Sequence, residues 1–284
     1  MSHHLMSRRP SRRTAAAAAL LTVSALALSA CGDGGAEAGP EGEATIRVAT
    51  HLPTMYDLLE VAGDVAEGQG YEVDIVQVND NVQYNRILAD GEVDANFAQH
   101  QPFMEAYNAE NDADLEAVAP IYDARVGFYS REHDQVEDIP EGARVAIPND
   151  HSNEGRALAI LEAEGLITLS EDAGYEARLS DIEENPLDLD FFQIDLLNLA
   201  SAYEEEDVAL VFNYPNYMID TTGLTPDDAV LLEEPEDLHF AISLVAREDN
   251  ADSEQIQVLE EAMTSQEVRD FLEEEYGESL FAAF

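Results

Sequence analysis

Residues 46–78 read IRVATHLPTMYDLLEVAGDVAEGQGYEVDIVQV, and this stretch by itself predicts the fold class. The β-branched run at 46–50 predicts a strand, and residues 54–67 carry apolar side chains at helical spacing. A second strand-like run follows at 72–78. A strand, a helix and a strand in succession are typical of an α/β protein with a mostly parallel sheet.

The same alternation continues to the end of the chain. Further strands are expected at 93–98, 144–147, 190–194, 208–212 and 239–246, and further helices at 82–89, from Pro102, at 153–164, 253–263 and 265–276. The pattern predicts two α/β lobes with boundaries near Glu141 and Leu238. Lobe 1 would comprise residues 46–140 together with 239–284, and lobe 2 residues 141–238.

The charge is strongly negative and unevenly distributed. The chain has 61 acidic and 13 basic residues, and the basic ones are all arginine. Four of these arginines precede residue 31, where there is no acidic residue, so the remainder has 9 arginines against 61 acids. Such a field repels phosphate backbones, which excludes nucleic acid as a partner. The acidity itself is typical of a solvated surface in saline or alkaline surroundings.

The N-terminus predicts export. Residues 1–13 are basic, residues 14–28 are apolar, and small residues precede Cys31. This arrangement indicates a signal peptide over residues 1–30, and its apolar run at residues 14–28 is too short to span a membrane. It resembles the lipobox of bacterial lipoproteins, which implies a lipid chain on Cys31. Residues 31–45 would then form the lipidated terminus and a flexible linker, because they are rich in Gly, Ala, Glu and Pro.

Three histidines follow predicted strands or lie in loops after them. His51, His100 and His151 therefore occupy positions where open α/β sheets bind ligands. A metal site built from these three imidazoles is one hypothesis, but no two of them have the local spacing of a zinc motif. Cys31 is the only cysteine, which excludes cysteine-based zinc and iron-sulfur sites in the folded part. We expect no metal and no other cofactor.

The segment 148–156, PNDHSNEGR, joins a predicted strand to a predicted helix. A helix N-terminus presents free N–H groups and the positive end of the helix dipole, which favours an anion. Arg156 in the first turns would add a bidentate donor for a carboxylate. The alternative is a surface arginine paired with one of the many acids. The motifs of serine hydrolases, zinc proteases, P-loop enzymes and dinucleotide-binding enzymes are absent from the sequence, so we expect a protein that is not an enzyme.

Several short motifs in order resemble one family. Residues 148–158 are similar to the PND-x-x-N-x-GRAL motif of methionine-binding lipoproteins of ABC importers, the NlpA type. Residues 94–100 are similar to the DAN-x-x-QH motif of the same family. The resemblance extends from Ile46 to Phe284 and implies a two-lobed, type II periplasmic-binding-protein fold with a central ligand cleft.

The resemblance also implies the function and the site. A protein of this family captures a free amino acid, with methionine the leading candidate, or a short peptide, and delivers it to an ABC permease and its ATPase. It would be a monomer anchored to the cell membrane through the lipid on Cys31, facing outside the cytoplasm. The implied ligand-binding residues are Arg156, Asn153, His100, Asn213, Asn81 and Phe97, with Arg156 holding the ligand carboxylate.

Three positions depart from the family pattern. Asn81 and Ala98 stand where the family usually has aromatic residues, and Ile242 stands where it has an asparagine. Aromatic rings contact methionine sulfur favourably, so the loss of two rings weakens the case for methionine. A more polar or larger ligand is therefore an alternative. Two other classes also stay open: a metal-binding lipoprotein that uses His51, His100 and His151, and an adhesion or regulatory lipoprotein without a small ligand.

Overall fold

The computed structural model describes residues 44–233, 238–277 and 279–284. The described residues all belong to one compact unit. The predicted signal peptide, Cys31 and nearly all of the predicted linker lie outside the described residues. Within the described part of the chain, no helix is long and apolar enough to span a membrane.

Lobe 1 is built on a six-stranded sheet with the strand order β13-β4-β12-β3-β1-β2. Its strands are β1 (Ala44–Thr50), β2 (Tyr71–Gln77), β3 (Ala95–His100), β4 (Leu115–Ala124), β12 (Ile242–Arg247) and β13 (Leu280–Ala282). β1 pairs in parallel with β2 and β3, whereas β12 runs antiparallel between β3 and β4. The strand-helix-strand unit predicted from residues 46–78 is confirmed.

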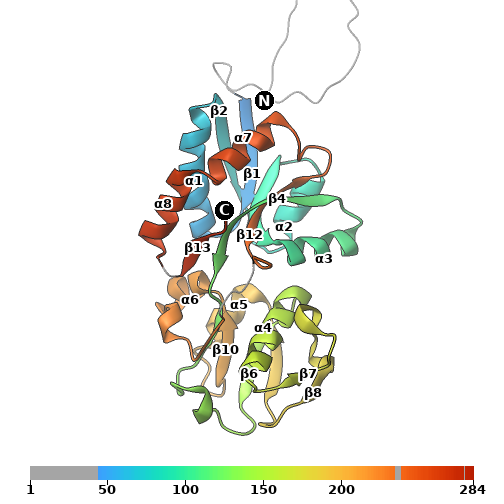
Figure 1. Cartoon of the computed structure of the whole chain (residues 1–284), viewed down its shortest axis with the longest axis vertical. Coiled ribbons are helices and arrows are strands. Elements are labelled where there is room, and N and C mark those ends of the chain that lie inside the picture. The colour runs from blue at the N-terminus through green and yellow to red at the C-terminus, as the bar shows by residue number, and fades with distance from the viewer. Residues whose placement is uncertain (1–43, 234–237, 278) are drawn as a thin grey trace, which may run out of the picture. The chain divides into compact units, whose positions relative to one another are not determined.

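Helices cover both faces of this sheet. They are α1 (Pro53–Glu67), α2 (Gln83–Ala89), α3 (Gln101–Asn111), α7 (Glu254–Met263) and α8 (Gln266–Glu275). α1 packs against β2, α7 and α8, and α2 and α3 lie on the opposite side of the lobe (Figure 1). α1 buries Met55, Leu58, Leu59 and Ala62, the spacing of one helical face.

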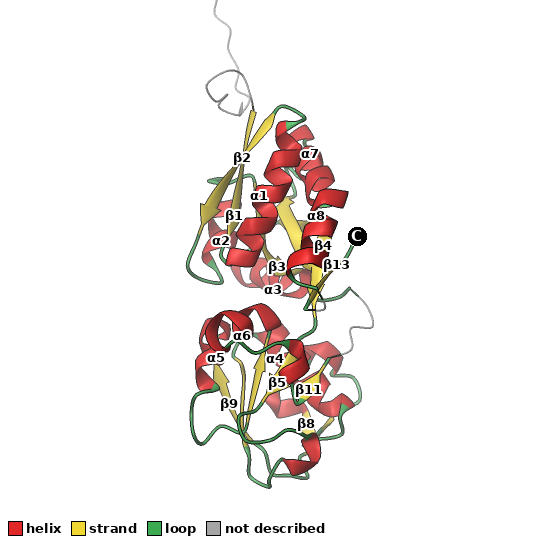
Figure 2. Ribbon diagram, turned by 90° about the vertical axis from the view of Figure 1, so that its left-hand side faces the viewer, coloured by secondary structure: helices red, strands yellow, loops and turns green. Residues whose placement is uncertain are grey.

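Lobe 2 has a five-stranded sheet with the order β11-β5-β10-β6-β9 (Figure 2). Its strands are β5 (Gly127–Tyr129), β6 (Arg144–Pro148), β9 (Asp190–Ile194), β10 (Leu210–Asn213) and β11 (Leu231–Leu232), and a separate pair is β7 (Thr168–Leu169) with β8 (Ile182–Glu184). Its helices are α4 (His151–Ala163), α5 (Leu196–Ala202) and α6 (Pro215–Thr222), with 3-10 turns at Val136–Asp138, Gly174–Glu176, Leu179–Asp181 and Pro226–Asp228. β6 pairs in parallel with β9 and β10, as expected for an α/β lobe.

Two segments carry the chain between the lobes. The first runs from β4 through Arg125 and Val126 into β5, which pairs with β10 and β11 of lobe 2. This crossing precedes the boundary expected near Glu141, because the sequence pattern did not reveal β4 and β5. The second segment runs from β11 to β12 and includes the boundary expected near Leu238. The two-lobed α/β fold expected from the sequence is confirmed.

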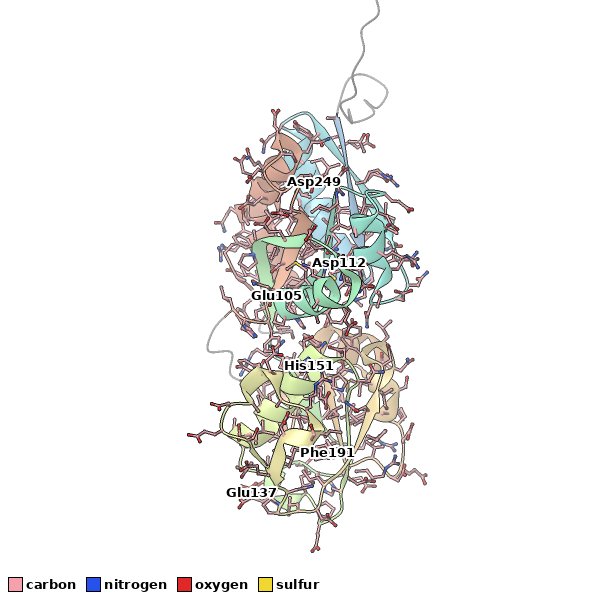
Figure 3. The ribbon with its side chains drawn as sticks, turned by 90° about the vertical axis from the view of Figure 1, so that its right-hand side faces the viewer. Glu105, Asp112, Glu137, His151, Phe191 and Asp249 are labelled. Atoms are coloured by element: carbon pink, nitrogen blue, oxygen red, sulfur yellow. The ribbon has the colours of Figure 1, made fainter. Side chains whose placement is uncertain are left out.

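The acidic residues are spread over both lobes. Glu105, Asp112, Glu137 and Asp249 are all exposed, and Figure 3 shows Glu105, Asp112 and Asp249 on lobe 1 and Glu137 on lobe 2. Like charges in this number repel one another most strongly in the compact folded state. The fold therefore carries an electrostatic cost that dissolved salt reduces.

We expect the melting temperature to rise when NaCl is added to a low-salt buffer at neutral pH. The screening length falls from about 30 Å at 0.01 M salt to about 8 Å at 0.15 M, so most of the gain should come at low concentrations. Differential scanning calorimetry across a salt series measures the effect. A melting temperature that does not change up to 0.15 M salt would contradict this expectation.

Gly155 lies inside α4 for a steric reason. A Cβ atom added at this position would overlap the backbone carbonyl of Tyr175, which packs directly on the helix. Gly63 is also inside a helix, α1, but a Cβ there would lie 3.6 Å from Val73 Cβ, an ordinary contact. The two glycines therefore differ only in the space beside them.

We predict opposite effects for the two Gly→Ala substitutions. Gly155→Ala should destabilise the protein by about 1 to 3 kcal/mol, because backbone atoms must move to accept the methyl group. Gly63→Ala should be neutral or stabilising by up to about 1 kcal/mol, because alanine favours the helix. Chemical denaturation of both variants measures the difference, and equal unfolding free energies would refute the steric explanation.

Candidate functional site

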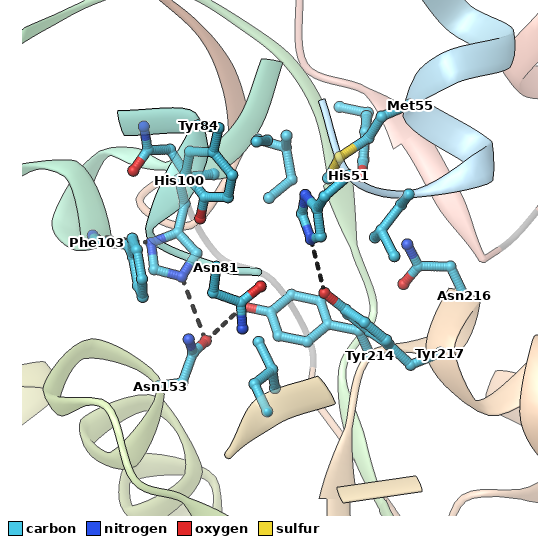
Figure 4. Close-up of a pocket in the computed structure, with 16 residues that line it drawn as sticks. His51, Met55, Asn81, Tyr84, His100, Phe103, Asn153, Tyr214, Asn216 and Tyr217 are labelled. Carbon is cyan, nitrogen blue, oxygen red and sulfur yellow. Dashed lines mark hydrogen bonds between the residues drawn. The ribbon is translucent and has the colours of Figure 1, made fainter. Parts of the chain in front are cut away.

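A small pocket lies between the two lobes and receives side chains from both (Figure 4). It contains about 400 Å³ of empty space, part of which opens to solvent. Lobe 1 contributes His51, Leu52, Met55, Asn81, Tyr84, Ala98, Gln99, His100, Phe103, Tyr122 and Ile242, and lobe 2 contributes Asn153, Leu196, Tyr214, Asn216 and Tyr217. A mostly apolar and aromatic lining with a few polar groups is typical of a site for a small molecule.

Two hydrogen bonds join the lobes beside this pocket. His51 follows β1, and its Nε2 lies 3.0 Å from the hydroxyl of Tyr217 in α6. His100 ends β3, and its Nε2 lies 3.3 Å from Oδ1 of Asn153 in the first turn of α4. Figure 4 shows both bonds at the pocket wall. Two histidines that the sequence placed after strands of lobe 1 therefore bind side chains of lobe 2 across the cleft.

The protonation of His100 follows from its partners. The backbone N–H of Phe103 donates to His100 Nδ1 at 3.2 Å, so Nδ1 is unprotonated and Nε2 carries the hydrogen. Nε2 then donates to Asn153 Oδ1. Burial, followed by the positive charge of Arg156, lowers the pKa of His100 to about 3. The ring is therefore neutral at physiological pH and acts as a fixed donor to Asn153.

His51 is also neutral, and it leaves one atom available. Burial lowers the pKa of His51 to about 4. Its Nδ1 is buried without a hydrogen-bond partner, and so is Oδ1 of Asn216, another residue of the pocket wall. Buried polar atoms without partners are rare and cost about 1 to 3 kcal/mol each. These two atoms are accordingly candidates for contact with a polar group of a ligand.

The two neutral histidines predict a loss of stability in mild acid. Unfolded histidine takes up a proton below its ordinary pKa of about 6.5, whereas folded His51 and His100 do so only near pH 4 and 3. The free energy of unfolding is therefore highest above pH 6.5. As the pH drops towards those values, it falls by up to about 1.4 kcal/mol per histidine and pH unit. The unfolding free energy of the wild type should fall more between pH 7 and 5.5 than that of a His51→Gln, His100→Gln double variant. Identical pH dependence of the two proteins would show that these histidines have no such effect.

Arg156 is buried behind the pocket wall and is not part of the pocket lining. Its side chain is only 1% exposed, and the guanidinium forms ion pairs with Glu233 and Asp123. Nη1 donates to the hydroxyl of Tyr214 at 3.2 Å, and that hydroxyl donates to Asn153 Oδ1 at 2.7 Å. Two hydrogen bonds in series therefore connect Arg156 to the pocket wall, through Tyr214 and Asn153. Sequence reasoning identified the arginine but not its three partners.

The other predicted site residues divide into two groups. Asn153, His100 and Asn81 line the pocket. Phe97 is buried behind the wall, where its ring meets that of Tyr122 edge-on at 5.8 Å, and Ala98, its neighbour on the strand, faces the pocket. Asn213 is fully buried at the end of β10 and accepts the backbone N–H of Tyr214, so it lies outside the lining.

The three departures from the family pattern, Asn81, Ala98 and Ile242, all line the pocket. Aromatic side chains nevertheless surround it: the lining includes Tyr84, Phe103, Tyr122, Tyr214 and Tyr217. Sequence reasoning missed these five rings because they come from separate elements of both lobes. The pocket thus keeps an aromatic wall although two rings are missing at the expected positions.

The three histidines of the metal hypothesis have separate partners. His51 contacts Tyr217, His100 contacts Asn153, and His151 lies 3.0 Å from the backbone oxygen of Glu176. Among the described residues, no three His, Cys, Asp or Glu side chains are grouped as metal ligands. This geometry gives the metal hypothesis no support.

Two α/β lobes joined by two crossing segments, with a small pocket lined from both, define a solute-binding protein of the two-lobed class. The sequence profile of the NlpA lipoprotein family matches residues 46–284. The chain therefore belongs to the NlpA lipoprotein family, which is a family of substrate-binding proteins.

Relatives of known function and structure agree with this assignment. The methionine-binding lipoprotein MetQ of Bacillus subtilis is 34% identical over 261 residues, which cover 91% of this chain and 94% of the relative. The crystal structure of a YaeC-family lipoprotein from Enterococcus faecalis is 49% identical, with a TM-score of 0.77, and covers 84% of this chain and 99% of its own. A nutrient-binding protein from Burkholderia cenocepacia, solved bound to methionine, is 31% identical, with a TM-score of 0.80 and coverage of 84% and 100%.

Proposed function

We propose that this protein captures a free amino acid, with methionine as the leading candidate, and delivers it to an ABC permease and its ATPase. The observation that carries the proposal is the pocket between the lobes, whose wall combines aromatic rings with a few neutral polar groups from both lobes. Relatives named for methionine binding support the choice of ligand. A binding role without catalysis also agrees with the absence of enzyme motifs in the sequence.

The two ends of the pocket suit the two ends of an amino acid. Met55 and the aromatic rings offer apolar and polarisable contacts to a side chain such as a thioether, each worth about 0.3 to 1.5 kcal/mol. Asn153 and the Tyr214 hydroxyl, backed by the charge of Arg156, form the polar end. We place the ligand carboxylate at this end, because Nη1 of Arg156 reaches the pocket wall there as a hydrogen-bond donor. Asn81 completes the proposed polar contacts, and His100 supports this end of the pocket by holding Asn153.

A short peptide is the second candidate ligand. A wider cleft, with about 1150 Å³ of empty space that includes open solvent, borders the pocket and shares Asn81, Phe103 and Leu196 with it. His151 lines this cavity, and Figure 3 shows it on lobe 2 where that lobe meets lobe 1. Additional residues of a peptide ligand would extend into this space. The departure at Asn81 lies in the wall that the two cavities share, whereas Ile242 lines only the smaller pocket.

The proposal includes an anchor at the cell membrane. The family is one of lipoproteins, and Cys31 follows the small residues that precede a lipoprotein cleavage site. A lipid on Cys31 would hold the protein on the outer side of the cytoplasmic membrane, near its permease, as a monomer. Metabolic labelling with a radioactive fatty acid tests this, because a Cys31→Ala variant should lose the label.

Thermal melting with a panel of candidate ligands tests the proposed function. The panel contains L- and D-amino acids, methionine dipeptides and divalent metal ions. A ligand at 100 times its dissociation constant should stabilise the protein by about 2.7 kcal/mol, which raises the melting temperature by several degrees. We expect the largest rise with methionine. A shift with metals alone would favour the metal-binding alternative, and a flat panel would favour a lipoprotein without a small ligand.

A further inference from the structure

The guanidinium of Arg156 forms ion pairs with an acid at the start of each of the two segments that join the lobes. Glu233 lies just after β11, at the start of the second crossing segment, and Asp123 lies near the end of β4, at the start of the first. Arg156 Nε lies 3.0 Å and 3.1 Å from the two carboxylate oxygens of Glu233, and Nη2 also donates to Glu233. Nη2 further contacts the backbone oxygen of Ala124 at 3.3 Å and Asp123 Oδ1 at 3.6 Å.

This arrangement leaves a different nitrogen for the pocket. The Nε and Nη2 edge is occupied by Glu233, and the ring of Phe240 covers the guanidinium with its centroid 4.4 Å from Cζ. Nη1 is the nitrogen that donates to Tyr214, a residue of the pocket wall. A bidentate carboxylate fixes both the position and the plane of a guanidinium. Glu233 therefore determines which nitrogen of Arg156 faces the ligand site.

We infer that Glu233 is a positioning residue for ligand recognition. It holds Arg156 by the Nε and Nη2 edge and directs Nη1 towards the end of the pocket that receives the ligand carboxylate. The inference rests on the proposed function, because it concerns the same site. Asp123 helps to neutralise the buried charge, but its 3.6 Å contact with a single nitrogen does not set the plane of the group.

If Glu233 were instead a competitor of the ligand, the effect of its substitution on affinity would have the opposite sign. If its carboxylate competed with the ligand for Arg156, removal of its charge would free the arginine and tighten binding. If it positions Arg156, the same change should weaken binding, and only for ligands that have a carboxylate. L-methionine and L-methioninamide differ in that group and keep the same side chain, so together they separate the two roles.

The experiment measures the dissociation constants of both probes by calorimetry for the wild type, Glu233→Gln and Glu233→Asp. Gln keeps the length of the side chain and removes the charge. Asp keeps the charge but shortens the side chain by one methylene group. Both variants should bind L-methionine about tenfold more weakly, or about 1.4 kcal/mol. L-methioninamide should change less than about threefold, about 0.7 kcal/mol on the same scale. Glu137→Gln, which removes one exposed charge of lobe 2, is the control and should change neither probe.

Three outcomes overturn the inference while leaving the function intact. Tighter binding of L-methionine by Glu233→Gln would show competition. Equal weakening of both probes would show a purely structural role. Unchanged affinity in both variants would show that Glu233 does not act on the ligand. If the wild-type protein binds neither probe, the proposed function fails and the inference fails with it. Melting curves of each variant verify that it is folded, and Glu233→Asp serves if Glu233→Gln is not.

Discussion

The burial of one guanidinium is the constraint on which the rest of this structure depends. An unpaired charge in the interior costs several kcal/mol or more, so Arg156 has to be surrounded by acceptors. The protein supplies them from the two segments that connect its lobes, through Glu233 and Asp123. The helix that carries Arg156 is thereby bound to both crossing segments. Arg156 also donates to Tyr214, which donates to Asn153, so the same guanidinium supports the wall of the ligand pocket.

The electrostatics of the whole chain and of the pocket are of different kinds. The surface is dominated by acidic residues, whereas the pocket wall presents neutral imidazoles, amides and hydroxyls. A zwitterionic amino acid has no net charge, so the surrounding negative field does not repel it as it would repel an anion. Burial keeps His51 and His100 neutral, and each bonds a residue of the opposite lobe. The polar wall is therefore made in part by contacts between the two lobes.

The site was only partly predictable from the sequence. The motif around residues 148–156 identified Arg156, Asn153 and the start of a helix, because capping residues and a strand-to-helix junction are local features. The same reasoning gave Arg156 a ligand as its partner. In the structure its guanidinium binds Glu233, which lies 77 positions further along the chain. Phe97 was expected in the ligand site, but alternation along β3 turns Ala98 to the pocket and leaves the ring of Phe97 behind its wall.

The sequence by itself determined the α/β class, most of the helices and strands, and the family, because hydrophobic periodicity and short motifs are properties of neighbouring residues. It did not reveal β4, β5 or α6, nor the point where the chain first crosses between lobes. Only the tertiary structure decided which acids bury the arginine and which rings enclose the pocket. Those contacts join residues that lie far apart along the chain, and among 61 acidic residues no local pattern distinguishes the two that pair with Arg156.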